Sequence, residues 1–326
     1  MKIALVTGAS GFIGRVLCKQ LQHRGWRVVA MMRHQVQGPW DRALANDLSD
    51  VDVHAVFEQI RHWGYGIDVI FHLASLVHAV RVKGVVAEDY FRLNVEGTGR
   101  MVELSRLAGA RSFVYFSSVK AVADPGENCV DETWDKPAAD VYGKSKHLAE
   151  QRVLALNAEG VHAAVIRPAL VYGRGVKGNL RRMLEAIDKG RMPNVNQAGN
   201  KRSMVAVEDL VELAILVAEK DKAAGQVYFA TDGERYSTKR IYETIAAALG
   251  RSPGVPVPVW MIKGLGLVLG GIEILFPHVL PVSKEMLSRL VGSACYLSDK
   301  ACRELGWQPK ATFESEIAGI VRHFKR

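Results

Sequence analysis

The sequence predicts an α/β fold in which helices cover both faces of a doubly wound parallel sheet. Over the first half of the chain, short apolar runs rich in branched residues alternate with amphipathic stretches, a pattern typical of parallel strands joined by helices. The first run, residues 3–7, leads into a glycine-rich turn and then into an amphipathic stretch over residues 15–23. A strand, a glycine turn and a helix in this order indicate the first unit of such a sheet.

The spacing of the apolar residues predicts where the strands and helices lie. Strands are expected at residues 3–7, 27–32, 68–73, 112–116 and 162–166, with helices near residues 14–24, 52–62, 88–108 and 141–158. After Pro168 glycines and prolines become frequent and the strands become short, although residues such as 226–231 return to the sheet. We therefore expect a doubly wound domain over residues 1–168 and a smaller mixed lobe, mainly substrate-binding, over residues 169–326.

The composition is that of an ordinary soluble globular protein. The chain has 326 residues, of which 48% are hydrophobic and 24% charged, so it can form one large or two modest domains. Its four cysteines, Cys18, Cys129, Cys295 and Cys302, form no C-x-x-C pair and no cluster with metal-ligand spacing, so we expect no metal site. Neither a disulfide framework nor a signal peptide is evident, and a reducing cytoplasm is the expected compartment.

The net charge of +9 suits a phosphate-bearing small molecule better than nucleic acid. The basic residues are scattered, and aromatic residues are not interleaved with them as in a stacking platform. Residues 260–276 are strongly apolar, but Lys263 and Glu273 interrupt them, and the uncharged part is too short to span a bilayer. We expect a buried helix there, with a peripheral membrane contact or a dimer surface as alternatives.

Three glycines in the first turn, Gly8, Gly11 and Gly14, predict a dinucleotide site. Gly8 permits the tight turn, Gly11 lets the backbone approach a pyrophosphate, and Gly14 lets the helix pack on the strand. The free N–H groups at the start of the helix, with the helix dipole, would hold the anion. The spacing is G-x-x-G-x-x-G rather than the usual G-x-G-x-x-G, and its place after an N-terminal strand supports the assignment.

Tyr142 and Lys146 lie one helical turn apart and predict an acid–base pair. A tyrosine hydroxyl, with a pKa of about 10, is a poor acid–base group at neutral pH. A cation one turn away would lower the pKa of Tyr142, so that the phenol could exchange a proton with an alcohol or a carbonyl. Ser118, which follows the strand at residues 112–116, could hydrogen-bond the same substrate oxygen.

Together these fragments resemble the extended short-chain dehydrogenase/reductase family, which includes the nucleotide-sugar epimerases and dehydratases. The resemblance covers nearly the whole chain and implies a Rossmann-type fold. Besides the glycine turn and the tyrosine–lysine pair, it is carried by Asp47-Leu48, His72 to Ser75, Leu93 to Thr98, Phe116 to Ser118, Arg167 to Gly173, Val205 to Leu210 and Arg303 to Trp307. We also expect a homodimer.

The resemblance implies roles for individual residues. Ser118, Tyr142 and Lys146 match the catalytic serine, tyrosine and lysine of the family. The implied cofactor-binding residues are Gly8, Ser10, Gly11, Phe12, Ile13, Gly14, Arg33, Asp47, Leu48, Leu73, Ala74, Ser75, Tyr142, Lys146 and Pro168. The implied substrate contacts are Ser118, Lys120, Asn179, Arg202 and Arg289. The guanidinium groups of the two arginines suit a nucleotide diphosphate.

Two departures from the family pattern refine these expectations. The second strand ends in Arg33 where NAD-binding members carry an acid, and an arginine there accommodates a 2′-phosphate. This points to NADP and leaves NAD possible. Ser118 is followed by Val119 and Lys120, which resembles a bacterial subgroup that includes 4-keto-6-deoxy-sugar reductases more than the typical 4-epimerases.

The resemblance thus implies an NAD(P)-dependent nucleotide-sugar oxidoreductase, and the first expectation is reduction of the C4 ketone of a nucleotide-linked 4-keto-6-deoxy hexose. A UDP-hexose 4-epimerase would use the same side chains. A small-carbonyl reductase of the dihydroflavonol-reductase-like kind is a third interpretation, against which Asn179, Arg202 and Arg289 argue. A non-catalytic NADP sensor is a fourth, but such proteins lose the tyrosine or the lysine, and this chain keeps both.

Overall fold

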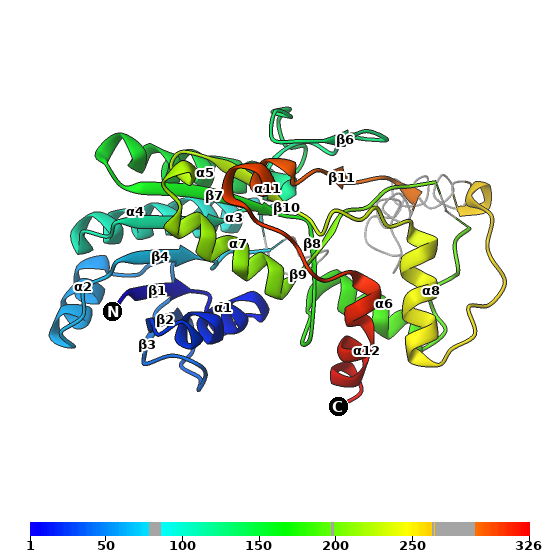
Figure 1. Cartoon of the computed structure of the whole chain (residues 1–326), viewed down its shortest axis with the longest axis horizontal. Helices are drawn as coiled ribbons and strands as arrows, with labels where there is room; N and C mark the ends of the chain where they lie inside the picture. The colour runs from blue at the N-terminus through cyan, green and yellow to red at the C-terminus, as the bar shows by residue number, and fades with distance from the viewer. Residues whose placement is uncertain (78–85, 197–198, 263, 265–290) are drawn as a thin grey trace.

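A seven-stranded parallel sheet forms the centre of the protein (Figure 1). The computed structural model describes residues 1–77, 86–196, 199–262, 264 and 291–326. Neighbouring strands all run parallel. In spatial order they are β10 (Val227–Ala230), β7 (His162–Pro168), β5 (Ser112–Phe116), β4 (Val69–His72), β1 (Ile3–Thr7), β2 (Arg27–Met32) and β3 (Arg42–Ala45). The order reverses between β1 and β4, and ligands of such sheets bind beyond the carboxyl ends of the strands at this point.

Helices cover both faces of the sheet. One face packs against α1 (Phe12–His23), α7 (Val207–Glu219) and α11 (Asp299–Leu305). The other packs against α2 (Val53–His62), α4 (Gly97–Ala108) and α5 (Val141–Leu154). Successive residues of a strand point to opposite faces, so Ala4 and Val6 of β1 belong to the first core and Leu5 to the second. The doubly wound parallel fold predicted from the sequence is confirmed.

A smaller lobe lies beside one end of the sheet, to the right in Figure 1. It contains α6 (Gly178–Asp188), α8 (Thr238–Leu249) and α12 (Phe313–Phe324), with a short parallel pair, β8 (Leu170–Tyr172) and β9 (Met204–Ala206). These elements share a core of their own, which includes Tyr172, Leu184, Tyr236, Ile245 and Phe313. Three short 3-10 helices also occur among the described residues, namely η2 (Val119–Ala121), η3 (Ala155–Glu159) and η4 (Asp221–Ala223).

Among the departures from the expected elements before residue 168, two concern the edge of the sheet and one of the helices that cover it. The edge strand β3 was not expected, and only Leu44 of its four residues is buried, so its apolar signal is weak. The single helix expected near residues 88–108 consists of α3 (Ala87–Tyr90), the π-helical turn η1 (Phe91–Glu96) and α4. π-turns inside helices occur frequently at functional sites.

Cys129 and Cys295 form a disulfide, which the sequence analysis did not expect. The bond joins β6 (Cys129–Val130) to β11 (Cys295–Tyr296), a short parallel pair between the segment after β5 and the C-terminal part of the chain. The cysteines are 166 residues apart and follow no spacing motif, so only the fold reveals their pairing. The argument from cysteine usage for a reducing compartment therefore loses its basis, and the cytoplasmic location stays a prediction.

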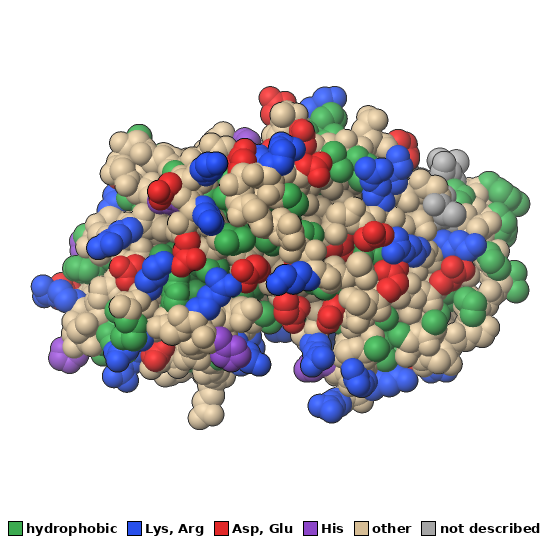
Figure 2. Space-filling model, in the orientation of Figure 1, with side chains coloured by type: hydrophobic (Ala, Val, Ile, Leu, Met, Phe, Trp, Pro, Cys, Tyr) green, Lys and Arg blue, Asp and Glu red, His purple; other side chains and the backbone are tan. Residues whose placement is uncertain are grey.

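The surface shows mixed charge. On the face drawn in Figure 2, Lys and Arg side chains are interspersed with Asp and Glu rather than gathered in one basic patch. In the part of the chain that the structure describes, no helix is long and apolar enough to cross a membrane. Nor do three His, Cys, Asp or Glu side chains of those residues meet in a way that could hold a metal ion. Most of the apolar segment at residues 260–276 lies outside the described residues.

We predict that loss of the disulfide destabilises the fold. Joining residues 166 positions apart restricts the unfolded chain, an effect of about 2–5 kcal/mol. Cys129→Ser should therefore lower the midpoint of thermal unfolding by roughly 5–10 °C, measured by circular dichroism without added thiol. Cys302→Ser is the matched control, since Cys302 is a free and only partly buried cysteine. Equal midpoints for the two variants would contradict the prediction.

Candidate active site

The glycine turn between β1 and α1 forms a cradle of backbone atoms. Gly8 has a φ of +67°, which side chains rarely adopt, and its N–H donates to the Met31 carbonyl over 2.9 Å. A Cβ at Gly14 would lie 2.3 Å from the Gly8 carbonyl oxygen, so only glycine lets α1 approach the turn this closely. Gly11 is the N-cap of α1, and no described side chain caps the first turn. Its N–H groups can therefore bind a phosphate anion.

Buried polar groups tie the loop after β4 to the same turn. The Thr7 hydroxyl accepts hydrogen bonds from the N–H groups of Leu73 and Ala74, each over 3.1 Å. His72 lies between two hydroxyls, 2.7 Å from that of Thr7 and 3.0 Å from that of Thr98. Burial lowers the pKa of His72 to about 3, so the ring is neutral and serves as a brace.

Asn94, in the π-helical turn η1, links this loop to α5. Its side-chain amide accepts from the Leu76 N–H over 2.7 Å and donates to the Leu76 carbonyl over 3.1 Å. The same amide donates to the Ser145 hydroxyl over 2.9 Å, and Ser145 in turn donates to the Tyr142 carbonyl. The loop over the glycine turn and the helix that carries Tyr142 therefore hold each other in place.

Ser118 and Tyr142 come together through a close contact between backbones. Ser118 is the N-cap of η2, just after β5, and Tyr142 is buried in the first turn of α5. The Ser118 hydroxyl hydrogen-bonds the Tyr142 phenol. A Cβ at Gly143 would lie 2.1 Å from the Lys120 carbonyl oxygen, so a glycine lets η2 pack directly on α5. The sequence analysis missed Gly143, although its place beside Tyr142 was a usable signal.

Lys146 is a buried cation one turn after Tyr142. Its side chain is 1% exposed, and its ammonium donates to the Phe116 carbonyl over 2.6 Å. The Nζ atom also lies 4.3 Å from the centre of the Tyr115 ring, whose face attracts a cation. Burial nevertheless lowers the pKa of Lys146 to about 7, because the charged form has lost its water.

The pKa of Tyr142 is shifted in the direction opposite to the one that the sequence predicted. The helical spacing predicted that Lys146 would lower it, whereas burial raises it to about 12. Desolvation of the phenol is the largest effect on the pKa of Tyr142, and the Ser118 hydrogen bond opposes it. The Lys146 ammonium is bound to the Phe116 carbonyl instead. Tyr142 is therefore a neutral phenol at pH 7 and can donate a proton.

Three residues expected to touch the cofactor turn their side chains into the protein. Phe12 packs against the core of the lobe, Ile13 against the core of the sheet, and Leu48 is buried beneath α4. Any contact that these residues make with a cofactor would therefore come from their backbone atoms, and their role stays a prediction. Hydrophobic side chains at the start of a helix and after a strand are more stable against their own core than against a polar dinucleotide.

The remaining cofactor candidates lie at the strand ends. Arg33 is exposed just after β2, and Asp47 is exposed two residues after β3. The hydrogen bond that the Ser49 N–H donates to Asp47, and to a lesser extent the charge of Arg33, lower the pKa of Asp47. The Asp47 carboxylate is therefore charged, and it lies near Arg33. Pro168 is buried at the end of β7, opposite Ala230 of β10. Ser10 and Ser75 are half-buried in the two loops that flank the switch point.

Of the expected substrate residues, Ser118 and Lys120 lie at η2, just after β5, whereas Asn179 and Arg202 lie after residue 168. The Lys120 ammonium binds the Asp124 carboxylate at 2.5 and 2.6 Å. Asn179 is exposed in the first turn of α6. Arg202 pairs through its backbone with Tyr236 and Ala294, and its guanidinium donates to the Gly292 carbonyl over 3.2 Å. Arg289 lies outside the described residues.

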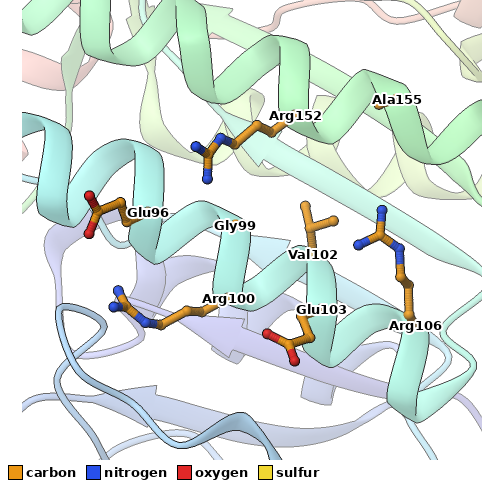
Figure 3. Close-up of a pocket in the computed structure, with 8 residues that line it drawn as sticks. All are labelled: Glu96, Gly99, Arg100, Val102, Glu103, Arg106, Arg152 and Ala155. Carbon is orange, nitrogen blue, oxygen red and sulfur yellow. The ribbon is translucent and has the colours of Figure 1, made fainter.

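An open groove of about 790 Å³ lies elsewhere, between α4 and α5 (Figure 3). Charged side chains line most of it, namely those of Glu96, Arg100, Glu103, Arg106 and Arg152. Ser118, Tyr142 and Lys146 are not among the residues that line this groove. The candidate active site is therefore the set of strand ends around Tyr142, and the groove is a separate surface feature.

Comparison with known proteins identifies the family. The family model described as the NAD dependent epimerase/dehydratase family matches residues 4–230. The chain belongs to this family. A UDP-glucose 4-epimerase of Vibrio cholerae is 29% identical to this chain over an alignment of 330 residues, which covers 99% of this chain and 95% of the relative. A 3-beta-hydroxysteroid dehydrogenase of Mycolicibacterium neoaurum is 30% identical over 340 residues, with coverages of 98% and 90%.

Solved structures agree on the fold. MoeE5 in complex with UDP-glucose and NAD superimposes with a TM-score of 0.77 at 23% identity, covering 99% of this chain and 98% of that one. The family and the relatives make this epimerase/dehydratase-family member an oxidoreductase of the short-chain dehydrogenase/reductase type. The glycine turn fits the pyrophosphate of a nicotinamide dinucleotide, because a Cβ at Gly8 or Gly14 would meet backbone atoms at 2.9 and 2.3 Å while the N–H groups of α1 remain open.

We predict that Gly143→Ala disrupts the site without disrupting the fold. The added methyl would force η2 away from α5 and separate Ser118 from Tyr142. Misplacing catalytic groups by about 1 Å costs on the order of 10² in turnover. Gly99→Ala is the matched control, because its Cβ would meet only the flexible end of Arg152, at 2.5 Å. Steady-state turnover and circular dichroism of both variants check this, and equal turnover would refute it.

Proposed function

We propose that this enzyme reduces the C4 ketone of a nucleotide-linked 4-keto-6-deoxy hexose. The observation that carries the proposal is the burial of Tyr142 beside Ser118, which raises the pKa of the phenol and favours its neutral form. A ketone reductase needs a proton donor at the carbonyl oxygen, whereas an enzyme that begins by oxidising an alcohol needs a base there. A buried phenol with a pKa of about 12 suits the first task.

In the proposed reaction Tyr142 donates its proton to the ketone oxygen, and the Ser118 hydroxyl orients that oxygen. Lys146 binds the ribose of the cofactor, and the hydrogen bond from Ser118 stabilises the phenolate that Tyr142 becomes. The glycine turn holds the pyrophosphate, and Pro168 and the loop at Leu73 to Ser75 lie at the strand ends beside it. The nicotinamide supplies the hydride when it is bound.

A nucleotide diphosphate is the proposed anchor of the substrate. Asn179 stands exposed at the start of α6, where open N–H groups favour an anion, and the positive charge of Arg202 favours a phosphate. The net charge of +9 favours a phosphate-bearing substrate. The epimerase relative is named for a UDP-sugar, and a UDP-sugar is bound in the MoeE5 structure.

NADP is the proposed form of the cofactor, with NAD as the alternative. Arg33 is exposed at the end of β2, the position at which an acid would bind a ribose 2′-hydroxyl. A guanidinium there attracts a 2′-phosphate instead. NAD is the cofactor named for the MoeE5 structure, so the preference of the present chain rests on Arg33.

Two other activities have specific support. The epimerase relative favours a 4-epimerase, which would oxidise and then reduce the same carbon with a retained cofactor. The hydroxysteroid dehydrogenase relative favours reduction of a carbonyl that carries no nucleotide. A reductase consumes one reduced cofactor per turnover, an epimerase consumes none, and a non-nucleotide reductase does not need a nucleoside diphosphate, so stoichiometry and ligand binding separate the three.

We predict mole-for-mole oxidation of NADPH by a UDP- or dTDP-4-keto-6-deoxy hexose, followed at 340 nm. Turnover should fall by about 10²–10⁴ in Tyr142→Phe, since one acid–base group is lost. NADPH should bind more tightly than NADH, and the difference should shrink in Arg33→Ala.

The controls for this assay are UDP-galactose and a simple ketone. Interconversion of UDP-galactose and UDP-glucose without net loss of NADPH would replace the proposal with an epimerase. Turnover of the ketone alone, with no binding of any nucleoside diphosphate, would replace it with a small-carbonyl reductase.

A further inference from the structure

Glu150 is a buried carboxylate that the proposed reaction does not use. It lies one turn after Lys146 on α5, so Tyr142, Lys146 and Glu150 follow one another along the same side of the helix. Glu150 is 2% exposed. The Lys-x-x-x-Glu spacing was visible in the sequence, but the sequence analysis did not single it out.

Arg167 holds this carboxylate in its charged form. Its Nε and Nη2 atoms donate to the two oxygens of Glu150 over 2.8 and 2.6 Å, and Arg167 is itself 6% exposed. Burial acts to raise the pKa of Glu150, but the hydrogen bonds and charge of Arg167 outweigh it and lower the pKa overall. Because Arg167 precedes Pro168 at the end of β7, the pair connects α5 to the edge of the candidate site.

Stability alone is a weak reason for such a pair. Moving two ions out of water costs several kcal/mol for each ion, and well-packed apolar side chains often stabilise a protein as much as a buried ion pair does. An apolar pair could therefore join α5 to β7 equally well. A charged pair beside a buried lysine has an additional electrostatic effect on that lysine.

The charge on Lys146 depends on the groups that face it. From β4 and β5, His72 and Tyr115 are neutral, since burial lowers the pKa of the histidine to about 3 and raises that of the tyrosine. From α5 itself, Tyr142 is neutral and Glu150 is negative, and the Glu150 charge raises the pKa of Lys146 against the larger effect of burial.

Two further charged or titratable groups lie next to Glu150. Arg167 of β7 is positive, and both of its donor atoms are directed at the Glu150 oxygens. His147, on α5, has its Nδ1 3.6 Å from Glu150 and is half exposed to solvent. Both reduce the negative potential that reaches Lys146, so the ammonium keeps its charge by a narrow margin.

We propose that Glu150, held by Arg167, is a positioning residue that favours the charged form of the buried Lys146 ammonium, so that Lys146 can bind the cofactor ribose up to about neutral pH. This inference rests on the function proposed above, in which Lys146 binds that ribose. Glu150 touches neither cofactor nor substrate and acts through Lys146.

The experiment is the pH dependence of NADP⁺ binding, measured by calorimetric titration between pH 5.5 and 8.5 in the parent protein, Glu150→Gln and Glu150→Asp. Loss of the negative charge lowers the pKa of Lys146. As pH rises, the ammonium of the variant therefore deprotonates at a lower pH than that of the parent. Glu150→Gln should bind NADP⁺ as the parent does near pH 5.5 and about ten-fold more weakly at pH 8, a shift of about one pH unit.

Glu150→Asp is the matched control, because it keeps the charge and loses the forked geometry with Arg167. Its affinity should follow the pH profile of the parent, although both variants should unfold at lower temperature. The proposal would be overturned if NADP⁺ bound Glu150→Gln more weakly by the same factor at every pH, or if the pH profile of binding shifted equally in the two variants. Either result would mean that packing and not charge is responsible.

A second variant covers the case in which Glu150→Gln fails to fold. The double variant with Glu150→Gln and Arg167→Gln removes both charges of the pair, so that no buried arginine is left without its carboxylate, and the shift toward lower pH should persist in it at reduced size. A profile identical to that of the parent would overturn the proposal. Failure of the parent itself to bind either NADP⁺ or NAD⁺ would instead refute the function on which the inference rests, so the two failures are distinguishable.

Discussion

The hydrogen bond from the buried Lys146 ammonium to the Phe116 carbonyl is the constraint on which the rest of the site depends. It joins the middle of α5 to the end of the central strand β5 over 2.6 Å. An α-helix turns by about 100° per residue, so this bond fixes which side of α5 faces the sheet. Tyr142 and Glu150, one turn to either side of Lys146, then face the strand ends as well. Because Ser118 lies two residues after Phe116, the same hydrogen bond brings Ser118 to the phenol of Tyr142.

Close backbone contacts preserve this arrangement. Gly143 allows η2 to pack on α5, and Gly8 allows the loop at Ala74 to pack on the first turn. The amide of Asn94 joins that loop to α5. The candidate cofactor cradle and the candidate acid–base residues therefore belong to one rigid network, in which polar groups are buried but paired. Such networks specify one geometry, because leaving any member unpaired costs free energy.

The sequence predicted the parallel sheet because buried strands are apolar on both faces and the helices between them are amphipathic. It did not predict β3, which is mostly unburied, or the link between Cys129 and Cys295, which depends on a contact across 166 residues. It predicted that Ser118, Tyr142 and Lys146 gather, since spacing and strand ends determine that. It gave the wrong direction for the pKa of Tyr142 because the depth of burial, which decides the sign, is not visible in a local motif.

The proposed chemistry depends on Lys146 as a buried cation that binds the cofactor. Calorimetric titration of NADP⁺ and NAD⁺ into the parent and Lys146→Met tests it directly. Charged hydrogen bonds contribute about 1.5–3 kcal/mol, so the variant should bind the preferred dinucleotide at least about ten-fold more weakly. Its thermal midpoint should stay the same or rise, because an apolar side chain replaces a desolvated charge. Equal affinity in the two proteins would contradict the claim.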